Sequence, residues 1–198
     1  MRIFVAGATG VIGSRVVPLL VDAGHIVAGL TRTPGKADLI RAAGAEPVVC
    51  DVYDADALTA AVQAFRPDLI IHELTDLPDD ADELPARRSA NARIRVEGTR
   101  NLLAAAAASD CNGFIAESVA WPMPPGEGAD AVTELEQTVL AYGGVVLRYG
   151  QLYGPGTYYP DSLPTDPRVH VDTAAATTVA ALDHSTGILT ITDPQSID

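Results

Sequence analysis

The stretch that decides the fold is Arg2-Ile3-Phe4-Val5-Ala6, followed at once by Gly7-Ala8-Thr9-Gly10-Val11-Ile12-Gly13. The first five residues predict a buried β-strand, and residues 11–23 predict the helix after it. Gly7 permits a tight turn, Gly10 lets a pyrophosphate approach the backbone, and Gly13 lets the helix pack close to the strand. Free N–H groups at such a helix start bind phosphate. We therefore predict a dinucleotide site with contacts from Gly7, Thr9, Gly10, Val11, Ile12 and Gly13.

The remaining sequence alternates short apolar runs with longer Ala-rich helical stretches, which is typical of a parallel sheet covered by helices. The predicted strands are 2–6, 26–30, 46–50, 68–72, 113–117 and 144–148, with a late pair near Val169 and at 188–192. The predicted helices are 11–23, 54–65, 85–109, 130–141 and 173–182. We expect an α/β fold, a Rossmann-type doubly wound parallel sheet with helices on both faces, in one domain over residues 1–198.

Composition narrows the classes of partner. The chain has 198 residues, 47% of them hydrophobic, a net charge of -13 and a pI near 4.5. Such an acidic chain is unsuited to a phosphate backbone, so we expect no nucleic-acid partner. No stretch approaches the roughly 20 apolar residues of a membrane span, and the N-terminus lacks the pattern of a signal peptide. We expect a cytoplasmic protein with no membrane partner.

The end of the second predicted strand indicates which dinucleotide is bound. An acidic residue there would bind the adenine ribose hydroxyls of NAD, but the chain has Gly29-Leu30-Thr31-Arg32 instead. Arg32, with Lys36 nearby, is suited to a 2′-phosphate. The prediction is NADP, with NAD as the alternative, and a solvated surface role for Arg32 as the competing interpretation.

Further motifs carry a family resemblance. They are Asp51-Val52 after the third strand, Ile70-Ile71-His72-Glu73-Leu74-Thr75, Glu97-Gly98-Thr99-Arg100-Asn101-Leu102-Leu103, Leu147 to Gly156, and Val169-His170-Val171-Asp172. With the glycine run they resemble the short-chain dehydrogenase/reductase superfamily, on its NAD-dependent epimerase/dehydratase branch. The resemblance implies that Asp51 and Val52 contact adenine and that Leu74 and Thr75 lie beside the cofactor. It also implies that Tyr149 and Tyr153 lie near the nicotinamide.

One family feature is missing. The redox chemistry of the family uses a Tyr with a Lys four residues later, and a Ser or Thr that holds the substrate oxygen. The only lysine of this chain is Lys36, at the adenine end, so the Tyr-x-x-x-Lys pair is absent. The remaining catalytic candidates are Ser118, Tyr153 and Glu73. Ser118 is the candidate for the family's Ser or Thr. An ungapped match offers Val119 as the alternative at that position, and one residue reverses the face of a strand.

Glu73 and Glu117 end two adjacent predicted strands, where they could face the cleft as a carboxylate pair. Burial would raise the pKa of one of them and suit it to acid or base work. The competing interpretation is a pair of exposed strand ends. The histidines are widely separated, and we expect no metal site.

Two irregular stretches, 121–128 and 154–167, follow predicted strands and would overhang the carboxyl edge of the sheet, as ligand-contact loops or as plain surface loops. Extended members of the family continue into a small substrate domain, whereas this chain stops at Asp198. We therefore expect a shallow cleft, open or completed by a second subunit. The Ala-rich residues 104–108 suit a homodimer contact or packing on the chain's own sheet.

Three functions compete at this point. The first is an atypical NADP(H)-dependent oxidoreductase of a small organic substrate, since hydride transfer belongs to the cofactor and needs mainly orientation. The second is a non-catalytic protein that senses NADP(H) through differential binding. The third is a non-redox cyclase, isomerase or dehydratase that uses Glu73 or Glu117 as its base.

Overall fold

The fold is built on one seven-stranded parallel sheet. A computed structural model describes residues 1–194 of the chain. The strand order is β3-β2-β1-β4-β5-β6-β9, and every neighbouring pair is parallel. The strands are β1 (Arg2–Ala6), β2 (Ile26–Thr31), β3 (Glu46–Val49), β4 (Leu69–His72), β5 (Gly113–Val119), β6 (Val145–Tyr149) and β9 (Gly187–Ile191). The predicted Rossmann-type doubly wound sheet is confirmed.

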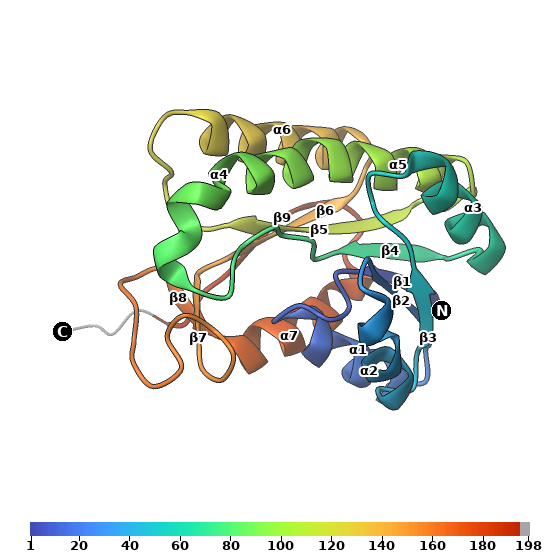
Figure 1. The fold of residues 1–198 in the computed structure, drawn as a ribbon, viewed down its shortest axis with the longest axis horizontal. Coiled ribbons are helices and arrows are strands. Elements are labelled where there is room, and N and C mark those ends of the chain that lie inside the picture. Colours follow the sequence, from blue (N-terminus) through green and yellow to red (C-terminus); the bar gives the residue numbers. More distant parts are fainter. Residues whose placement is uncertain (195–198) are drawn as a thin grey trace.

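Helices cover both faces of the sheet (Figure 1). One layer contains α1 (Gly13–Asp22), α2 (Ala37–Ala42) and α7 (Val171–Ala180); the other contains α3 (Ala55–Phe65), α4 (Leu84–Arg93), α5 (Thr99–Ala107) and α6 (Glu127–Ala141). Alternate strand residues supply two separate cores: Ile3 and Val5 face the first layer, and Phe4 and Ala6 face the second. This alternation explains why the strands are apolar at nearly every position.

The structure departs from the prediction in the long helix over 85–109. That helix is divided into α4 and α5 by a π-helical turn at Ile94–Gly98. The sequence continues to favour helix on both sides of the turn, so its pattern does not reveal the interruption. The short helix α2 was not predicted, because six residues contain too little periodicity. Within α5, Ala105 and Ala106 are fully buried in the core of their own chain.

The last part of the chain adds a small parallel ribbon beside the main sheet. It pairs β7 (Gln151–Tyr153) with β8 (Arg168–His170), and the irregular stretch predicted at 154–167 joins them. Over residues 1–194, none of the helices combines the length and apolarity that crossing a bilayer takes.

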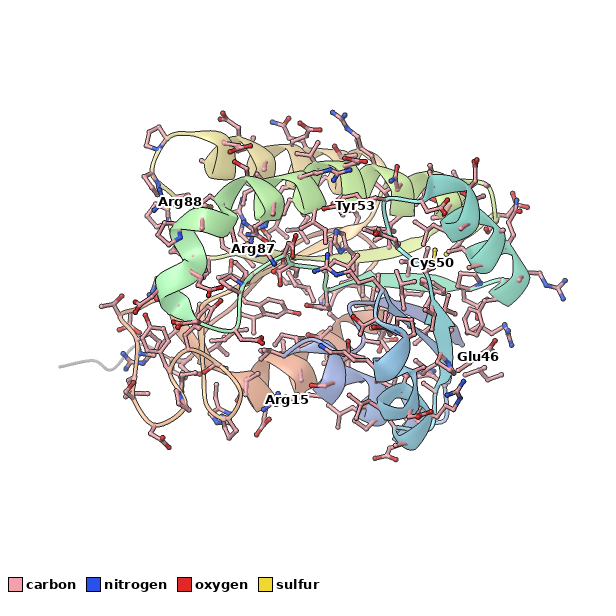
Figure 2. The ribbon with its side chains drawn as sticks, viewed as in Figure 1. Arg15, Glu46, Cys50, Tyr53, Arg87 and Arg88 are labelled. Carbon is pink, nitrogen blue, oxygen red and sulfur yellow. The ribbon has the colours of Figure 1, made fainter. Side chains whose placement is uncertain are left out.

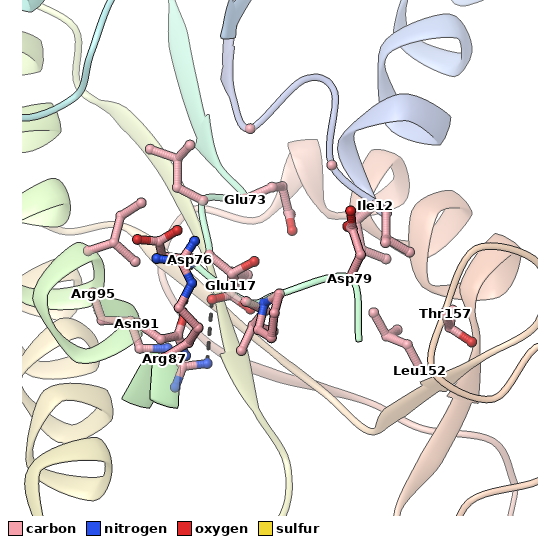
Figure 3. A pocket seen from close by; sticks show the side chains of 18 of the residues that line it. Ile12, Glu73, Asp76, Asp79, Arg87, Asn91, Arg95, Glu117, Leu152 and Thr157 are labelled. Atoms are coloured by element: carbon pink, nitrogen blue, oxygen red, sulfur yellow. Dashed lines mark hydrogen bonds and ion pairs between the residues drawn. The ribbon is translucent and has the colours of Figure 1, made fainter. Parts of the chain in front are cut away.

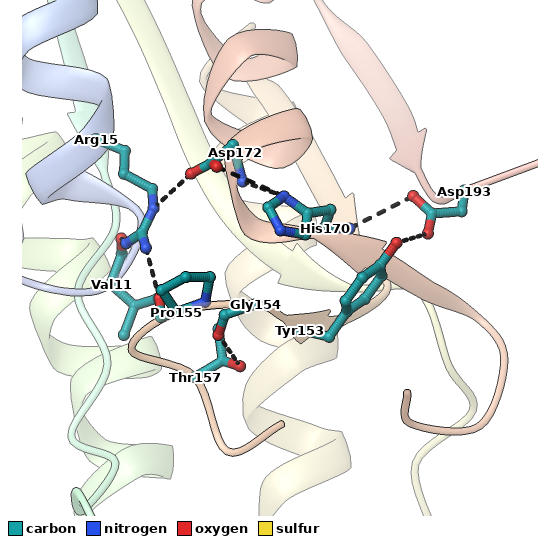
Figure 4. Close-up of polar contacts among 9 residues, drawn as sticks. All are labelled: Val11, Arg15, Tyr153, Gly154, Pro155, Thr157, His170, Asp172 and Asp193. Carbon is teal, nitrogen blue, oxygen red and sulfur yellow. Dashed lines mark hydrogen bonds and ion pairs between the residues drawn. The ribbon is translucent and has the colours of Figure 1, made fainter. Parts of the chain in front are cut away.

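Arg15 ties this ribbon to the first helix (Figure 4). Its guanidinium donates to the Pro155 carbonyl over 2.5 Å and forms an ion pair with Asp172 at 2.8 Å. A third hydrogen bond goes to the Val11 carbonyl, 2.8 Å away, in the glycine turn. The loop after β7 is thus held beside the start of α1.

Candidate functional site

A cleft of about 1240 Å³ lies at the carboxyl edge of the sheet, where the strand order reverses between β1 and β4. Ligands of open α/β folds bind at this position. Most of the site residues predicted from the sequence line this cleft. They are Gly7, Thr9, Gly10, Val11, Ile12, Arg32, Asp51, Val52, Glu73, Leu74, Thr75, Ser118 and Tyr149. Two predicted residues, Gly13 and Tyr153, are not among the residues that line it.

The glycine turn has the shape that a pyrophosphate requires. Gly7 has a φ of 92°, and a Cβ there would lie 2.5 Å from the Glu73 carbonyl oxygen. A Cβ on Gly13 would lie 2.1 Å from the Gly7 carbonyl oxygen, so Gly13 closes the turn rather than facing the ligand. Helix α1 has no side-chain cap at its start. The N–H groups of Ser14, Arg15 and Val16 donate to carbonyl oxygens of the turn, whereas those of Val11 and Ile12, just before the helix, have no acceptor in the described part of the chain and fit a dinucleotide phosphate.

One end of the cleft, beside β2 and β3, contains the charged residues that the sequence predicts to bind the adenosine part of the cofactor. Arg32, Lys36 and Asp51 all line it. Arg32 Nη2 forms an ion pair with Asp76 Oδ1 at 3.0 Å, and the Arg32 side chain stays 55% exposed. Asp76 itself is buried, and its backbone N–H donates to Asn91 on α4. Arg32 therefore has a carboxylate partner in the cleft, while more than half of its side chain is exposed.

Glu73 lies at the opposite end, within a buried chain of hydroxyl groups. Tyr149 Oη lies 2.9 Å from Glu73 Oε1 and 2.7 Å from Thr178 Oγ1. Thr178 Oγ1 in turn lies 2.8 Å from the Ala174 carbonyl oxygen. Burial and then the charge of Glu117 raise the pKa of Glu73 well above its ordinary value, against the lowering effect of the Tyr149 hydrogen bond.

Glu117 is the buried carboxyl group that faces Glu73 in the cleft (Figure 3). Its exposed fraction is 8%, the same as that of Glu73, so the predicted carboxylate pair is buried. Arg95 Nη2 lies 3.7 Å from Glu117 Oε1. Burial raises the pKa of Glu117, although the charge of Arg95 acts to lower it.

The π-helical turn positions Arg95. His72 Nδ1 accepts a hydrogen bond from the Leu74 N–H, so its Nε2–H donates to Thr99 Oγ1 over 3.0 Å. The Thr99 hydroxyl then donates to the Arg95 carbonyl over 2.5 Å. Burial, followed by the Arg95 charge, lowers the pKa of His72 to about 3, so the ring is neutral. His72 is therefore a structural link between β4 and Arg95.

Ser118 lines the cleft, but its hydroxyl has a partner on α6. It donates to Glu136 Oε1 over 2.6 Å, and Arg148 binds the same carboxylate with two hydrogen bonds. Burial acts to raise the pKa of Glu136, but the hydrogen bonds from Arg148 and Ser118 make the net shift downward. Glu136 is thus an ionised acceptor that holds the Ser118 hydroxyl toward α6.

Tyr153 lies in the ribbon and points away from the cleft. Its hydroxyl donates to Asp193 Oδ2 over 2.6 Å, and its ring meets the His170 ring edge-on (Figure 4). This position does not support the predicted catalytic role of Tyr153. In the described part of the chain, no three His, Cys, Asp or Glu side chains gather as a metal ion would require.

Two loops form the rim of the cleft. One follows β4 and contains Pro78, and the other follows β7 and contains Tyr158. The Tyr158 hydroxyl donates to the Pro78 carbonyl, so the loops touch each other. Arg87, on α4, lines the cleft from above the sheet (Figures 2 and 3).

Sequence analysis missed several residues of this site, and three of them illustrate why. In the sequence, Arg95 stands among helix-forming residues and has no distinguishing signal. It lines the cleft because it lies in the π-helical turn. Thr178 follows the period of α7, and nothing local links it to Tyr149. Asp76 follows directly after Leu74-Thr75, and its charge so close to a predicted cofactor contact was a usable signal.

A parallel sheet with a glycine turn at its switch point defines the class of dinucleotide-binding α/β proteins. The sequence profile of the NAD dependent epimerase/dehydratase family matches residues 3–143. The chain belongs to this family, as its motifs predicted.

A reductase is among the relatives. The 3-diazoavenalumate denitrifying reductase of Streptomyces sp is 37% identical over 238 aligned residues, which cover 98% of this chain and 77% of the relative. An uncharacterized protein of Schizosaccharomyces pombe is 48% identical over 62 residues, 31% of this chain and 21% of that protein.

Solved structures share the fold. The Thermus thermophilus UDP-glucose 4-epimerase in complex with NAD matches with a TM-score of 0.80 at 23% identity, over 98% of this chain and 78% of that one. The Thermotoga maritima UDP-glucose 4-epimerase with UDP-glucose has a TM-score of 0.77 at 19% identity, over 96% and 76% of the two chains.

Proposed function

We propose that this chain is an NADP(H)-dependent reductase of a small organic substrate. The observation that carries the proposal is one continuous cleft with two chemically different ends. Arg32 and Lys36 lie at one end, beside the residues suited to adenosine, and the buried carboxyl groups Glu73 and Glu117 lie at the other. The kinship with a reductase supports the same conclusion.

Bound NADPH would supply the hydride, and the chain would supply binding and orientation. Gly7, Gly10 and the N-terminus of α1 would hold the pyrophosphate. Arg32 and Lys36 would bind the 2′-phosphate, because a guanidinium and an ammonium are both suited to a phosphate. The two loops that meet at Tyr158 and Pro78 would restrict water at the rim.

The purified full chain tests this proposal directly. NADPH and NADH are titrated by fluorescence, and NADPH oxidation is then followed with aldehydes, quinones, enones and aryl diazo compounds. The last class is included because the Streptomyces relative is named for a diazo substrate. We expect NADPH to bind more tightly than NADH and at least one class to be reduced. Binding without turnover across all four classes would contradict the reductase function and favour a sensing role.

A non-redox activity is the second candidate, and the buried glutamates favour it. A carboxylate in a dry site can act as a base without any net oxidation. Turnover of a substrate with no change in nicotinamide absorbance would identify this activity. A single cytoplasmic domain and a homodimer remain predictions, which cell fractionation, limited proteolysis and sedimentation would test.

A further inference from the structure

The buried end of the cleft contains more acidic side chains than basic ones. Two carboxyl groups, Glu73 and Glu117, face this end, and one guanidinium, Arg95, pairs with Glu117. Among the described residues, no Lys, Arg or His side chain forms an ion pair with Glu73. An unpaired buried carboxylate is so costly that such a group normally takes up a proton.

The hydrogen bonds around Glu73 agree with a protonated carboxyl group. Each hydroxyl of Tyr149 and Thr178 has only one proton to donate. The Tyr149 hydroxyl lies within hydrogen-bond distance of Glu73 Oε1 and of Thr178 Oγ1, and Thr178 Oγ1 lies within that distance of the Ala174 carbonyl oxygen. If Glu73 is an ionised acceptor of the Tyr149 hydroxyl, these three contacts share only two protons. A proton on Glu73 supplies the third, and Tyr149 can then donate to Thr178.

Glu73 also lies where a reaction would take place. Its carbonyl oxygen packs against Gly7 of the pyrophosphate turn, and its residue lines the cleft. The groups that face its carboxyl are Tyr149 from β6, Thr178 from α7 and Glu117 from β5, with Arg95 behind Glu117. The hydroxyl of Ser118 is held by Glu136 and points toward another helix.

We infer that Glu73 is a protonated carboxyl group held by the chain Glu73–Tyr149–Thr178–Ala174, and that it donates the proton when the substrate is reduced. This inference rests on the proposed reductase function. For a carbonyl substrate, NADPH would supply a hydride to carbon. The Glu73 O–H group would turn from Tyr149 to the substrate oxygen, and its O–H bond would break as a new O–H bond forms there. The products are an alcohol, NADP⁺ and the Glu73 carboxylate, which takes a proton back from water.

Infrared difference spectroscopy tests the protonation state without any turnover. The spectrum of wild type minus Glu73→Gln at neutral pH should contain the carbonyl stretch of a protonated carboxyl group, shifted in heavy water. Glutamine preserves the shape, and its amide N–H can donate to Tyr149, so the variant should fold. A difference spectrum with only carboxylate bands would overturn the inference.

Thr178→Val tests the direction of the chain. Valine removes the hydroxyl that accepts from Tyr149, which leaves Tyr149 free to donate to Glu73 and favours the ionised carboxylate. The protonated band should therefore weaken in Thr178→Val. A band of undiminished intensity would remove Thr178 from the chain and overturn the inferred direction.

Kinetics test the donor role. Positioned general acids contribute about 10²- to 10⁴-fold, so Glu73→Gln should lower kcat by about 100-fold or more while NADPH affinity stays near wild type. Glu46→Gln, at the exposed start of β3, is the matched control and should behave as wild type (Figure 2). Undiminished kcat in Glu73→Gln would overturn the donor role. A wild-type protein that reduces no substrate would instead refute the proposed function and the donor role with it, and the infrared band would still decide the protonation state.

Discussion

Arg32 and Asp76 are 44 residues apart in the chain, yet their side chains form an ion pair at 3.0 Å on the adenosine side of the cleft. The pair brings an acidic group next to the guanidinium that we expect to bind the 2′-phosphate. The Asp76 carboxylate holds Arg32 in place and also repels an approaching phosphate. Arg32 should therefore favour NADPH over NADH, and Asp76 should oppose that preference.

The first prediction concerns Arg32→Ala. A hydrogen bond to a charged group contributes about 1.5–3 kcal/mol, and the exposure of Arg32 reduces this, so NADPH affinity should fall by about tenfold. NADH affinity should barely change, because NADH lacks the 2′-phosphate. Fluorescence titration measures both, with Arg41→Ala on α2 as the exposed control. An equal loss for the two cofactors would show that Arg32 does not discriminate between them.

Asp76→Asn gives the complementary prediction. Removing the carboxylate removes its repulsion of the 2′-phosphate, while the amide oxygen can still accept from Arg32. NADPH affinity should rise and the preference over NADH should widen in the same titration. A weaker affinity for NADPH would mean that orientation of Arg32 by Asp76 outweighs repulsion.

Gly13→Ala should damage the turn itself. The added Cβ would lie 2.1 Å from the Gly7 carbonyl oxygen, and backbone atoms cannot move away cheaply. Overpacking of this kind costs about 1–3 kcal/mol, and the displaced turn should also lose dinucleotide affinity. Thermal unfolding and NADPH titration measure the two effects. Gly35→Ala is the matched control, because nothing lies within 4 Å of its added Cβ.

The stability of Glu73→Gln relative to wild type should depend on pH. The pKa of Glu73 is raised above its ordinary value of 4.5 in the folded protein, so its stabilising effect is full below that value and is lost as pH rises toward the folded value. In that window folding wild type takes up a proton, and stability falls by about 1.4 kcal/mol per pH unit. Urea unfolding across this range should show that the free energy of unfolding of Glu73→Gln rises relative to that of wild type as pH increases. A constant difference would contradict a raised pKa.

Ser118→Ala should separate the family's usual Ser position from the proton donor proposed for this chain. The Ser118 hydroxyl donates to Glu136, which keeps two hydrogen bonds from Arg148 without it. Losing one hydrogen bond should cost about 1 kcal/mol of unfolding free energy. We expect kcat to fall far less than in Glu73→Gln when both are measured under one set of conditions. A loss as large as that of Glu73→Gln would return Ser118 to the catalytic role that the sequence predicted.

The strands and the cofactor turn were predictable because their causes are local. Buried parallel strands are apolar at nearly every position. The glycine spacing has a steric cause, and in the structure a Cβ on Gly7 or Gly13 would collide with backbone atoms. The buried acid cluster was only partly predictable. Glu73 and Glu117 end adjacent strands, but Thr178 reaches Tyr149 only through the packing of α7. Arg95 depends on a π turn whose causes lie in the contacts of His72 and Thr99.

The contact between Tyr158 and Pro78 bears on how this cleft can change over evolution. The acceptor is a backbone carbonyl, so the bond does not depend on which side chain stands at position 78. The side chain at position 78 can therefore be replaced without loss of that contact, as long as Tyr158 is kept. Substrate range can diversify in the loops while the strand ends that hold Glu73 and Tyr149 stay the same.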